Sequence, residues 1–145
     1  MNRPAAPLVR NLEPQDIGPA AAVLVLAALN ARRDPVIGVA TGSSPSPLYD
    51  ALSASGADFT RAAWFALDEY VGLPPGHPES YAEVLRREII EPLGLDPKTV
   101  HLPDPHREDL QAACDDYERR IAAAGGIDLQ ILGIGRNGHL AFNEP

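Results

Sequence analysis

The sequence predicts an α/β protein, a three-layer α/β/α sandwich with a mostly parallel, Rossmann-like sheet. Short apolar runs at 36–40 and 62–67 do not alternate with polar residues, which is typical of strands buried on both faces. Segments with helical periodicity separate the predicted strands, and these connections are long enough for right-handed crossovers. The 145 residues contain no evident linker or internal repeat, so we expect a single domain.

The first part of the chain is expected to hold a short edge strand at 7–11 and a helix at 19–33. This helix is rich in Ala and Leu, carries basic residues in its last turn, and ends before a proline. The buried strand at 36–40 follows. Ser44 is expected to cap the next helix, with Pro45 in its first position.

The remaining elements are expected as a strand at 62–67, a helix from 80 to about 90, a strand at 99–102, a helix at 108–124 and a strand at 128–132. The Ser-Tyr-Ala-Glu segment at 80–83 is a capping box that opens the first of these helices. An apolar stripe on the helix at 108–124 includes Cys114, which we therefore expect in the core.

Charge and composition exclude several classes of protein. With 12 basic and 20 acidic residues the net charge is −8, which disfavours non-specific nucleic-acid binding. The single cysteine excludes an internal disulfide framework and suits a cytoplasmic protein. The longest apolar run, 20–29, is too short to cross a bilayer. We therefore expect neither nucleic acid nor a membrane as a partner.

Polar sequences follow three predicted strands, and ligands of open α/β sheets bind beyond the carboxyl ends of strands. The first, Thr41, Gly42, Ser43 and Ser44, has small residues, hydroxyls and a following helix, as an anion site requires. An ordinary turn is the alternative. The second begins with Asp68 and Glu69, of which at most one side chain faces a shared site. The alternative is a solvated acidic pair.

The third polar segment, 133–139, contains the spacing Gly-x-Gly-x-x-Gly. As a dinucleotide fingerprint it is weak, because no long helix or later acidic residue accompanies it. His139 with Glu144 is instead a candidate acid/base couple, and an exposed histidine is the alternative. The other histidines show no metal-ligand spacing with Cys114, so we expect no metal site.

Specific motifs carry a family resemblance. They are Gly-Val-Ala-Thr-Gly-Ser-Ser-Pro at 38–45, Leu-Asp-Glu-Tyr-Val-Gly-Leu at 67–73, His-Pro-Glu-Ser-Tyr at 77–81, and the ending Gly-His-Leu-Ala-Phe-Asn-Glu-Pro. Together they resemble the glucosamine-6-phosphate deaminase family. The related 6-phosphogluconolactonases are similar at the first loop and at Gly138-His139, but are not expected to carry the second motif or Phe-Asn-Glu-Pro.

The resemblance implies a deaminase and isomerase, formally a hydrolase, of amino-sugar metabolism and N-acetylglucosamine catabolism. It implies conversion of glucosamine 6-phosphate to fructose 6-phosphate and ammonia without metal or organic cofactor. Residues 41–44 then hold the sugar phosphate, and Asp68 moves a proton between C2 and C1. His139 opens the sugar ring, oriented by Glu144 and by the residue at position 137. A sugar-phosphate sensor or a 6-phosphogluconolactonase-like hydrolase of the same fold is the alternative, and ammonia release distinguishes them.

Two departures from the family pattern lead to further expectations. Asn137 stands where better-known members carry Asp, which removes a charge beside His139. Family members also continue beyond the Asn-Glu-Pro motif, where basic phosphate ligands lie. We therefore expect residues 1–145 to be a domain that is incomplete at its C-terminus and inactive alone. Whether the protein is a homo-oligomer is left open by the sequence.

Overall fold

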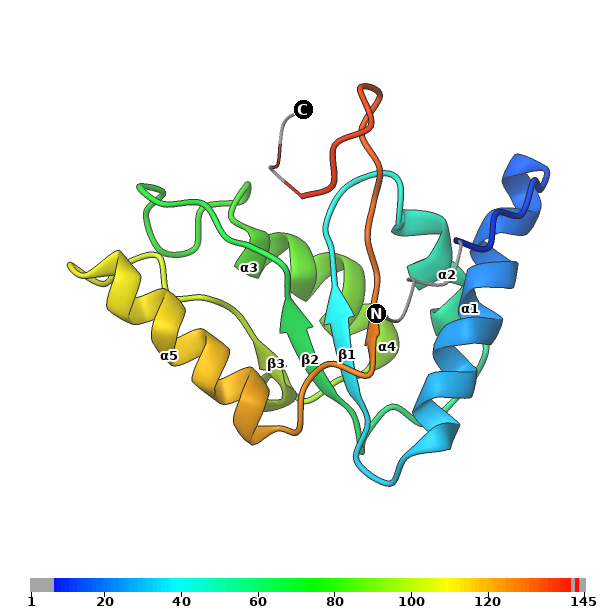
Figure 1. Cartoon of the computed structure of the whole chain (residues 1–145), viewed down its shortest axis with the longest axis horizontal. Helices are drawn as coiled ribbons and strands as arrows, with labels where there is room; N and C mark the ends of the chain where they lie inside the picture. Colours follow the sequence, from blue (N-terminus) through cyan, green and yellow to red (C-terminus); the bar gives the residue numbers. More distant parts are fainter. Residues whose placement is uncertain (1–6, 142, 144–145) are drawn as a thin grey trace, which may run out of the picture.

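The computed structural model describes residues 7–141 and 143, and its centre is a sheet of four parallel strands (Figure 1). The strands are β1 (Val36–Val39), β2 (Ala63–Ala66), β3 (Val100–His101) and β4 (Leu129–Gln130), in the spatial order β3-β2-β1-β4. Each lies within a run that the sequence predicts to be a strand. The parallel pairing confirms the predicted class of sheet.

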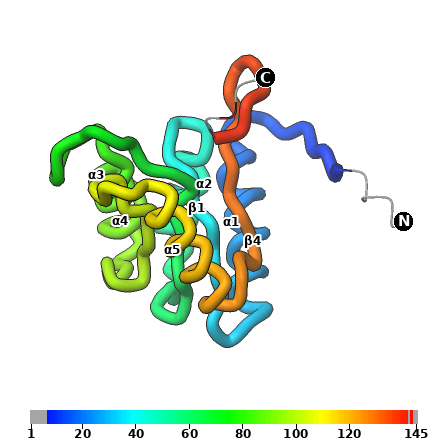
Figure 2. Tube along the Cα trace, turned by 60° about the vertical axis from the view of Figure 1, so that its left-hand side comes forward, coloured from blue at the N-terminus to red at the C-terminus, as the bar shows by residue number. Residues whose placement is uncertain are grey.

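The connections between the strands are largely helical (Figures 1 and 2). They include α1 (Pro14–Ala31), α2 (Ser46–Ala54), α3 (Tyr81–Leu85) and α5 (Leu110–Ala123). Helix α3 continues through a π-helical segment, η1 (Arg86–Ile90), into α4 (Glu91–Leu93), and a 3₁₀ turn, η2 (Pro97–Thr99), precedes β3. The predicted capping box begins α3, because the Ser80 hydroxyl accepts a hydrogen bond from the Glu83 N–H at 3.3 Å.

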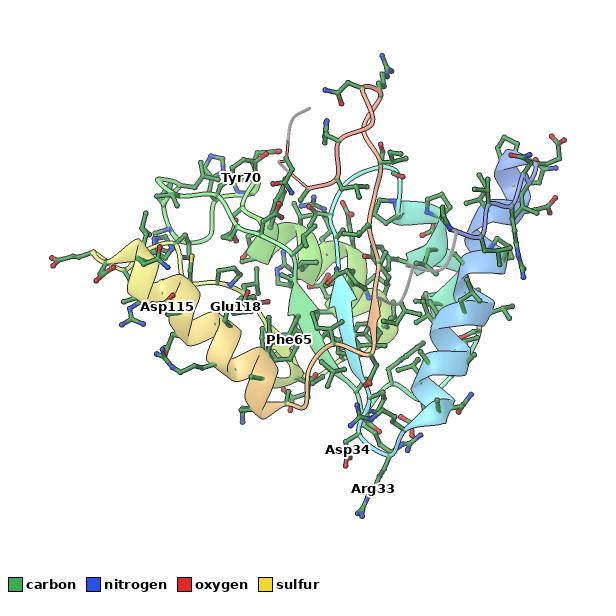
Figure 3. The ribbon with its side chains drawn as sticks, viewed as in Figure 1. Arg33, Asp34, Phe65, Tyr70, Asp115 and Glu118 are labelled. Carbon is green, nitrogen blue, oxygen red and sulfur yellow. The ribbon has the colours of Figure 1, made fainter. Side chains whose placement is uncertain are left out.

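Side chains on the strands alternate between two apolar cores. Ile37 and Trp64 are fully buried in the larger core, which also contains side chains of α1, α2 and α4. Val36 and Phe65 face the other way and pack with Tyr117 of α5 in a smaller core. Figure 3 shows Phe65 between the sheet and α5. Helices therefore cover both faces of the sheet, which confirms the three-layer sandwich.

The strand order reverses direction at β1, and this reversal sets the position of a site. The chain moves outward from β1 through β2 to β3, and then returns to place β4 on the other side of β1. In open α/β sheets the crevice at such a reversal is the usual ligand site. The segments that follow β1 and β4 run side by side beyond this end of the sheet in both views (Figures 1 and 2).

The N-terminal expectations need correction. Residues 7–11 form no strand, and α1 begins at Pro14, whose missing N–H is tolerated in a first turn, rather than at residue 19. The helix ends at Ala31, so no basic residue lies in its last turn. Arg32 instead forms an ion pair with Asp128 at 2.5 Å, just before β4.

The prediction for Cys114 is also wrong, because its side chain is exposed. The buried residues of α5 are Ala113 and Tyr117, so the apolar stripe passes through Ala113. Cys114 lies one position further, which turns it by about 100° away from the core.

Candidate functional site

A pocket of about 250 Å³ opens at the carboxyl ends of the strands. It is lined by the loops after β1, β2 and β4 and by the first residue of α3. The lining residues are 40–44, Leu67, Asp68, Tyr81, 133–135, His139 and Ala141. The three polar segments singled out in the sequence thus converge. Figure 3 shows Tyr70 at this end of the molecule, and Arg33 and Asp34 at the opposite end.

The loop after β1 forms one wall of the pocket. Gly42 has φ +108°, a conformation that side chains with a Cβ rarely adopt. The prediction that Ser44 caps α2 is wrong, because Pro45 is the N-cap residue and makes no side-chain cap. The Pro45 carbonyl accepts the N–H groups of Leu48 and Tyr49, at 3.0 and 3.4 Å. The Ser44 side chain is therefore exposed on the loop.

Asp68 is the carboxylate that faces the pocket. It is half-buried directly after β2, together with Leu67. Burial, and to a smaller degree the negative charge of Glu69, raises the pKa of the Asp68 carboxyl above its ordinary value. The site therefore holds a carboxylate whose charge is only partly solvated, which makes it more basic than a surface aspartate.

Glu69 points away from the pocket and caps α3. One carboxylate oxygen, Oε1, accepts the N–H groups of Tyr70 and Tyr81, each at 2.8 Å. The other, Oε2, accepts the N–H of Ala82 at 2.8 Å. Only Asp68 of this adjacent pair lines the pocket, as the sequence predicts. One carboxylate of the pair therefore lines the pocket while its neighbour holds the helix that forms the opposite wall.

Tyr81 lines the pocket and was not among the residues singled out for the site. Its hydroxyl donates to the Tyr70 hydroxyl at 3.3 Å. Burial, followed by this hydrogen bond, raises the pKa of Tyr81 to about 12. A signal existed in the sequence, because a helix that starts after a loop at this edge places its first residue there.

His139 lines the pocket from the loop after β4, and Asn137 holds its ring. The His139 Nδ1 lies 2.6 Å from the Asn137 Oδ1. Because an amide oxygen only accepts hydrogen bonds, this contact favours the ring hydrogen on Nδ1. Asn137 is not part of the pocket lining, so it acts on the pocket through His139.

A tight turn forms the loop that carries His139. The Gly138 N–H donates to the Gly135 carbonyl at 2.9 Å, and the Gly135 N–H donates to the His139 carbonyl at 2.9 Å. The imidazole lies directly over Gly135, where any Cβ would overlap the ring. The glycine spacing in this segment therefore serves a turn under a histidine rather than the start of a dinucleotide-binding helix.

Glu144 lies outside the described residues. Within residues 7–141 and 143, no group of three or more His, Cys, Asp and Glu side chains is arranged to hold a metal ion. Over the same residues, no helix combines the length and the apolar character needed to span a membrane.

Comparison with known proteins identifies the family of this chain. A sequence profile for glucosamine-6-phosphate isomerases/6-phosphogluconolactonase matches residues 15–142. The chain belongs to this family. Among its relatives, the glucosamine-6-phosphate deaminase of Pseudarthrobacter chlorophenolicus is 54% identical over 132 residues, which are 89% of this chain and 51% of the relative. Glucosamine-6-phosphate deaminase 2 of Bacillus subtilis is 44% identical over 86% of this chain and 51% of its own length.

Solved structures of the glucosamine-6-phosphate isomerase/6-phosphogluconolactonase family share the fold. A monomeric glucosamine-6-phosphate deaminase superposes with TM-score 0.83 at 32% identity, over 90% of this chain and 56% of that protein. The 6-phosphogluconolactonase of Thermotoga maritima superposes with TM-score 0.73 at 22% identity, over 88% of this chain and 60% of that protein. The chain thus spans about half the length of the curated relatives it matches.

The capping role of Glu69 predicts a loss of stability on truncation. Glu69→Ala removes the acceptor of three backbone N–H groups and is expected to lower the free energy of unfolding by about 1–2 kcal/mol. Urea denaturation followed by circular dichroism measures this. Glu79→Ala, at an exposed glutamate of the same loop, is the control and is expected to change it by less than about 0.5 kcal/mol. Equal losses in the two variants contradict the capping role.

The raised pKa of Asp68 predicts a pH-dependent gain of stability in Asp68→Asn. The folded state binds this proton more tightly than the unfolded state, so the contribution of Asp68 is lost as pH rises from its ordinary to its raised pKa. Asp68→Asn therefore melts at a higher temperature than the parent at pH 7, and the difference disappears near about pH 3.

The control for this experiment is Asp58→Asn, because the pKa of Asp58 is shifted in the opposite direction. Hydrogen bonds from the side chain and backbone of Thr60 lower the pKa of Asp58. Its ionised form therefore stabilises the fold above its ordinary pKa, and the substitution lowers the melting temperature at pH 7. A lower melting temperature of Asp68→Asn at pH 7 contradicts the partial burial of an ionised Asp68.

Proposed function

We propose that this chain carries the substrate pocket of a glucosamine-6-phosphate deaminase. The reaction consumes glucosamine 6-phosphate and water and yields fructose 6-phosphate and ammonia. The observation that carries the proposal is the convergence of Asp68, His139 and the 41–44 loop on one pocket. Relatives that are 44% and 54% identical and bear this name support the assignment.

The loop at 41–44 is proposed to hold the phosphate. Its small residues let backbone N–H groups approach an anion, and hydroxyls of Thr41, Ser43 and Ser44 add neutral donors. Helix α2 begins at Ser46, directly after the loop, with its partially positive end toward the pocket. This places the other end of an extended sugar phosphate within reach of the remaining pocket walls.

His139 is proposed to open the pyranose ring. Its Nε2 lone pair removes the proton of the anomeric hydroxyl, and the resulting imidazolium returns a proton to the ring oxygen. Asn137 supports the first of these steps, because its amide oxygen keeps the hydrogen on Nδ1. The family motif assigns a further orienting role to Glu144.

Asp68 is proposed to be the base of the isomerisation. It removes the C2 proton of the open-chain aldehyde while O1 takes up a proton, which gives an enolamine. Asp68 then delivers its proton to C1, and the amino nitrogen releases a proton. The product is a C2 ketimine. Water adds to this ketimine, and loss of ammonia from C2 gives the ketone of fructose 6-phosphate. A carboxylate whose pKa is raised by burial suits this work, because a base is most effective when its pKa approaches the working pH.

The domain organisation and the cellular compartment of the protein follow from the same proposal. We propose that the chain forms the first part of a single sugar-phosphate domain, since it covers 51% of the P. chlorophenolicus relative. A phosphorylated amino sugar is charged and stays where it is made, which favours the cytoplasm. The exposed thiol of Cys114 fits a reducing compartment.

An assay of ammonia release tests the function and the role of Asp68. The 145-residue chain, and the same chain completed with the C-terminal half of the P. chlorophenolicus relative, are incubated with glucosamine 6-phosphate. We expect turnover in the completed protein, and Asp68→Asn to reduce kcat by about 100-fold with a nearly unchanged KM. Asp115→Asn, on the outer face of α5, is the matched control and should retain the parental rate (Figure 3).

Two results count against this assignment. Retention of more than about a tenth of kcat in Asp68→Asn excludes the residue as the base. Hydrolysis of 6-phosphogluconolactone without ammonia release points to the lactonase reaction, and binding of glucosamine 6-phosphate without turnover points to a sensor.

The contact between Asn137 and His139 predicts a shift of the pH profile. Asn137→Asp places a negative charge 2.6 Å from the ring nitrogen, and this charge favours the protonated imidazole. The histidine-dependent limb of the kcat/KM profile of the completed enzyme is expected to move to higher pH. Asn137→Ser is the neutral control and should leave that limb in place. A shift to lower pH in Asn137→Asp would show that the two side chains do not act together.

A further inference from the structure

The hydrogen bonds between β1 and β4 end where the pocket begins. The Ile131 N–H donates to the Gly38 carbonyl at 2.8 Å, so the next bond of a parallel ladder would join the Ala40 N–H to the Ile131 carbonyl. The Ile131 carbonyl instead accepts the side-chain amide of Gln130 at 2.9 Å. Ala40, which lies between β1 and the 41–44 loop, therefore needs other partners.

Tyr49 of α2 supplies both of these partners. Its hydroxyl donates to the Ala40 carbonyl at 2.7 Å and lies 3.3 Å from the Ala40 N–H nitrogen, from which it accepts. Tyr49 is 2% exposed and Ala40 is 5% exposed, so these hydrogen bonds are buried. One phenol thus satisfies the donor and the acceptor of the residue that precedes Thr41.

Tyr117 of α5 plays the corresponding part at the end of β2, where it bonds the Ala66 carbonyl. Ala63 and Leu67 donate their N–H groups toward β1, so the carbonyl of Ala66 points toward β3. The register of β2 and β3 assigns this carbonyl to the N–H of residue 103, which is a proline and has none. The Tyr117 hydroxyl donates to the Ala66 carbonyl at 2.7 Å instead.

Both tyrosines are buried, and both use their hydroxyl to bond the backbone at the end of a strand. Tyr117 is 7% exposed and its hydroxyl also lies 3.1 Å from the His101 carbonyl, so it bridges the ends of β2 and β3. Burial raises the pKa of both Tyr49 and Tyr117, which keeps each hydroxyl a donor at every physiological pH. They come from opposite helical layers, and each contacts the backbone one or two residues before a pocket residue.

We propose that Tyr49 and Tyr117 are positioning residues, Tyr49 for the 41–44 loop and Tyr117 for the carboxylate of Asp68. A backbone carbonyl left without a partner in the interior either costs free energy or draws the strand end toward water. The loop that follows moves with it. The phenol rings fill the cores, and the hydroxyls fix where the two strands end. The catalytic part of the inference rests on the proposed deaminase function, whereas the structural part does not.

The test replaces each tyrosine by phenylalanine, which keeps the ring and removes the hydroxyl. In the 145-residue chain, 13C NMR follows the titration of the Asp68 carboxyl. Amide shifts of residues 41–44 follow the binding of inorganic phosphate. Tyr117→Phe is expected to lower the pKa of Asp68 toward its ordinary value and to leave phosphate affinity within about twofold. Tyr49→Phe is expected to weaken phosphate binding about tenfold and to leave the Asp68 titration unchanged.

Val25→Ala is the control for a general loss of stability, because it removes buried methyl groups from α1 and no hydrogen bond to a strand end. It should lower the melting temperature and change neither local signal. In the completed enzyme, Tyr117→Phe should lower kcat about 10- to 100-fold with little change in KM, and Tyr49→Phe should act mainly on KM.

The outcomes separate this inference from the proposed function. Variants that melt earlier but keep both the Asp68 titration and the phosphate response overturn the positioning roles. The absence of a phosphate response in the parent chain overturns the role of Tyr49. If the completed parent enzyme releases no ammonia, the proposed function fails, and the NMR results still decide whether the hydroxyls position the two segments.

Discussion

The pairing of β1 with β4 ends after Ile37↔Leu129 and Gly38↔Gln130. Beyond these pairs the backbone groups of the two segments bond to other partners, and the pocket depends on this separation of the two segments. The chain leaves β1 toward α2 on one face of the sheet and enters β4 from α5 on the other. The Gln130 side chain lies over Gly38, where a Cβ would overlap it, and takes the carbonyl that would otherwise extend the ladder. A longer β1–β4 ladder would close the crevice that the loops now line.

The pocket is supported mainly by groups that do not line it. Glu69 caps α3 and so places Tyr81, and Asn137 orients the His139 ring, which lies over Gly135 of the pocket lining. Side chains in a pocket keep one rotamer only when their own surroundings restrict them. A polar site at the ends of strands has few apolar neighbours for this purpose. Hydrogen bonds from neighbouring backbone and side chains supply that restriction instead.

Much of this arrangement follows from local rules that a sequence contains. Apolar runs locate β1 and β2, the capping box locates α3, and the adjacency of Asp68 and Glu69 predicts that only one of them faces the pocket. The predictions are wrong where a partner that is distant in the sequence determines the local structure. Arg32 pairs with Asp128, 96 positions away, rather than stabilising the end of its own helix. The roles of Tyr49 and Tyr117 depend on which backbone groups a ladder leaves unpaired, and only the register of the sheet shows that.

The proposed phosphate site belongs to an acidic protein, and its hydrogen-bond donors therefore need rigid support. The chain has a net charge of −8, and the 41–44 loop contains no basic residue. In the proposed phosphate site, the contribution of this loop therefore comes from hydrogen bonds of backbone N–H groups and hydroxyls and from the start of α2. A positive charge attracts from any direction and over several ångströms, whereas a hydrogen bond weakens steeply when its angle or distance changes. A loop of neutral donors binds an anion only if those donors already point to one place. The Tyr49 hydroxyl, which lies in the core, holds the backbone of Ala40 directly after β1. It thereby fixes the position at which the 41–44 loop begins.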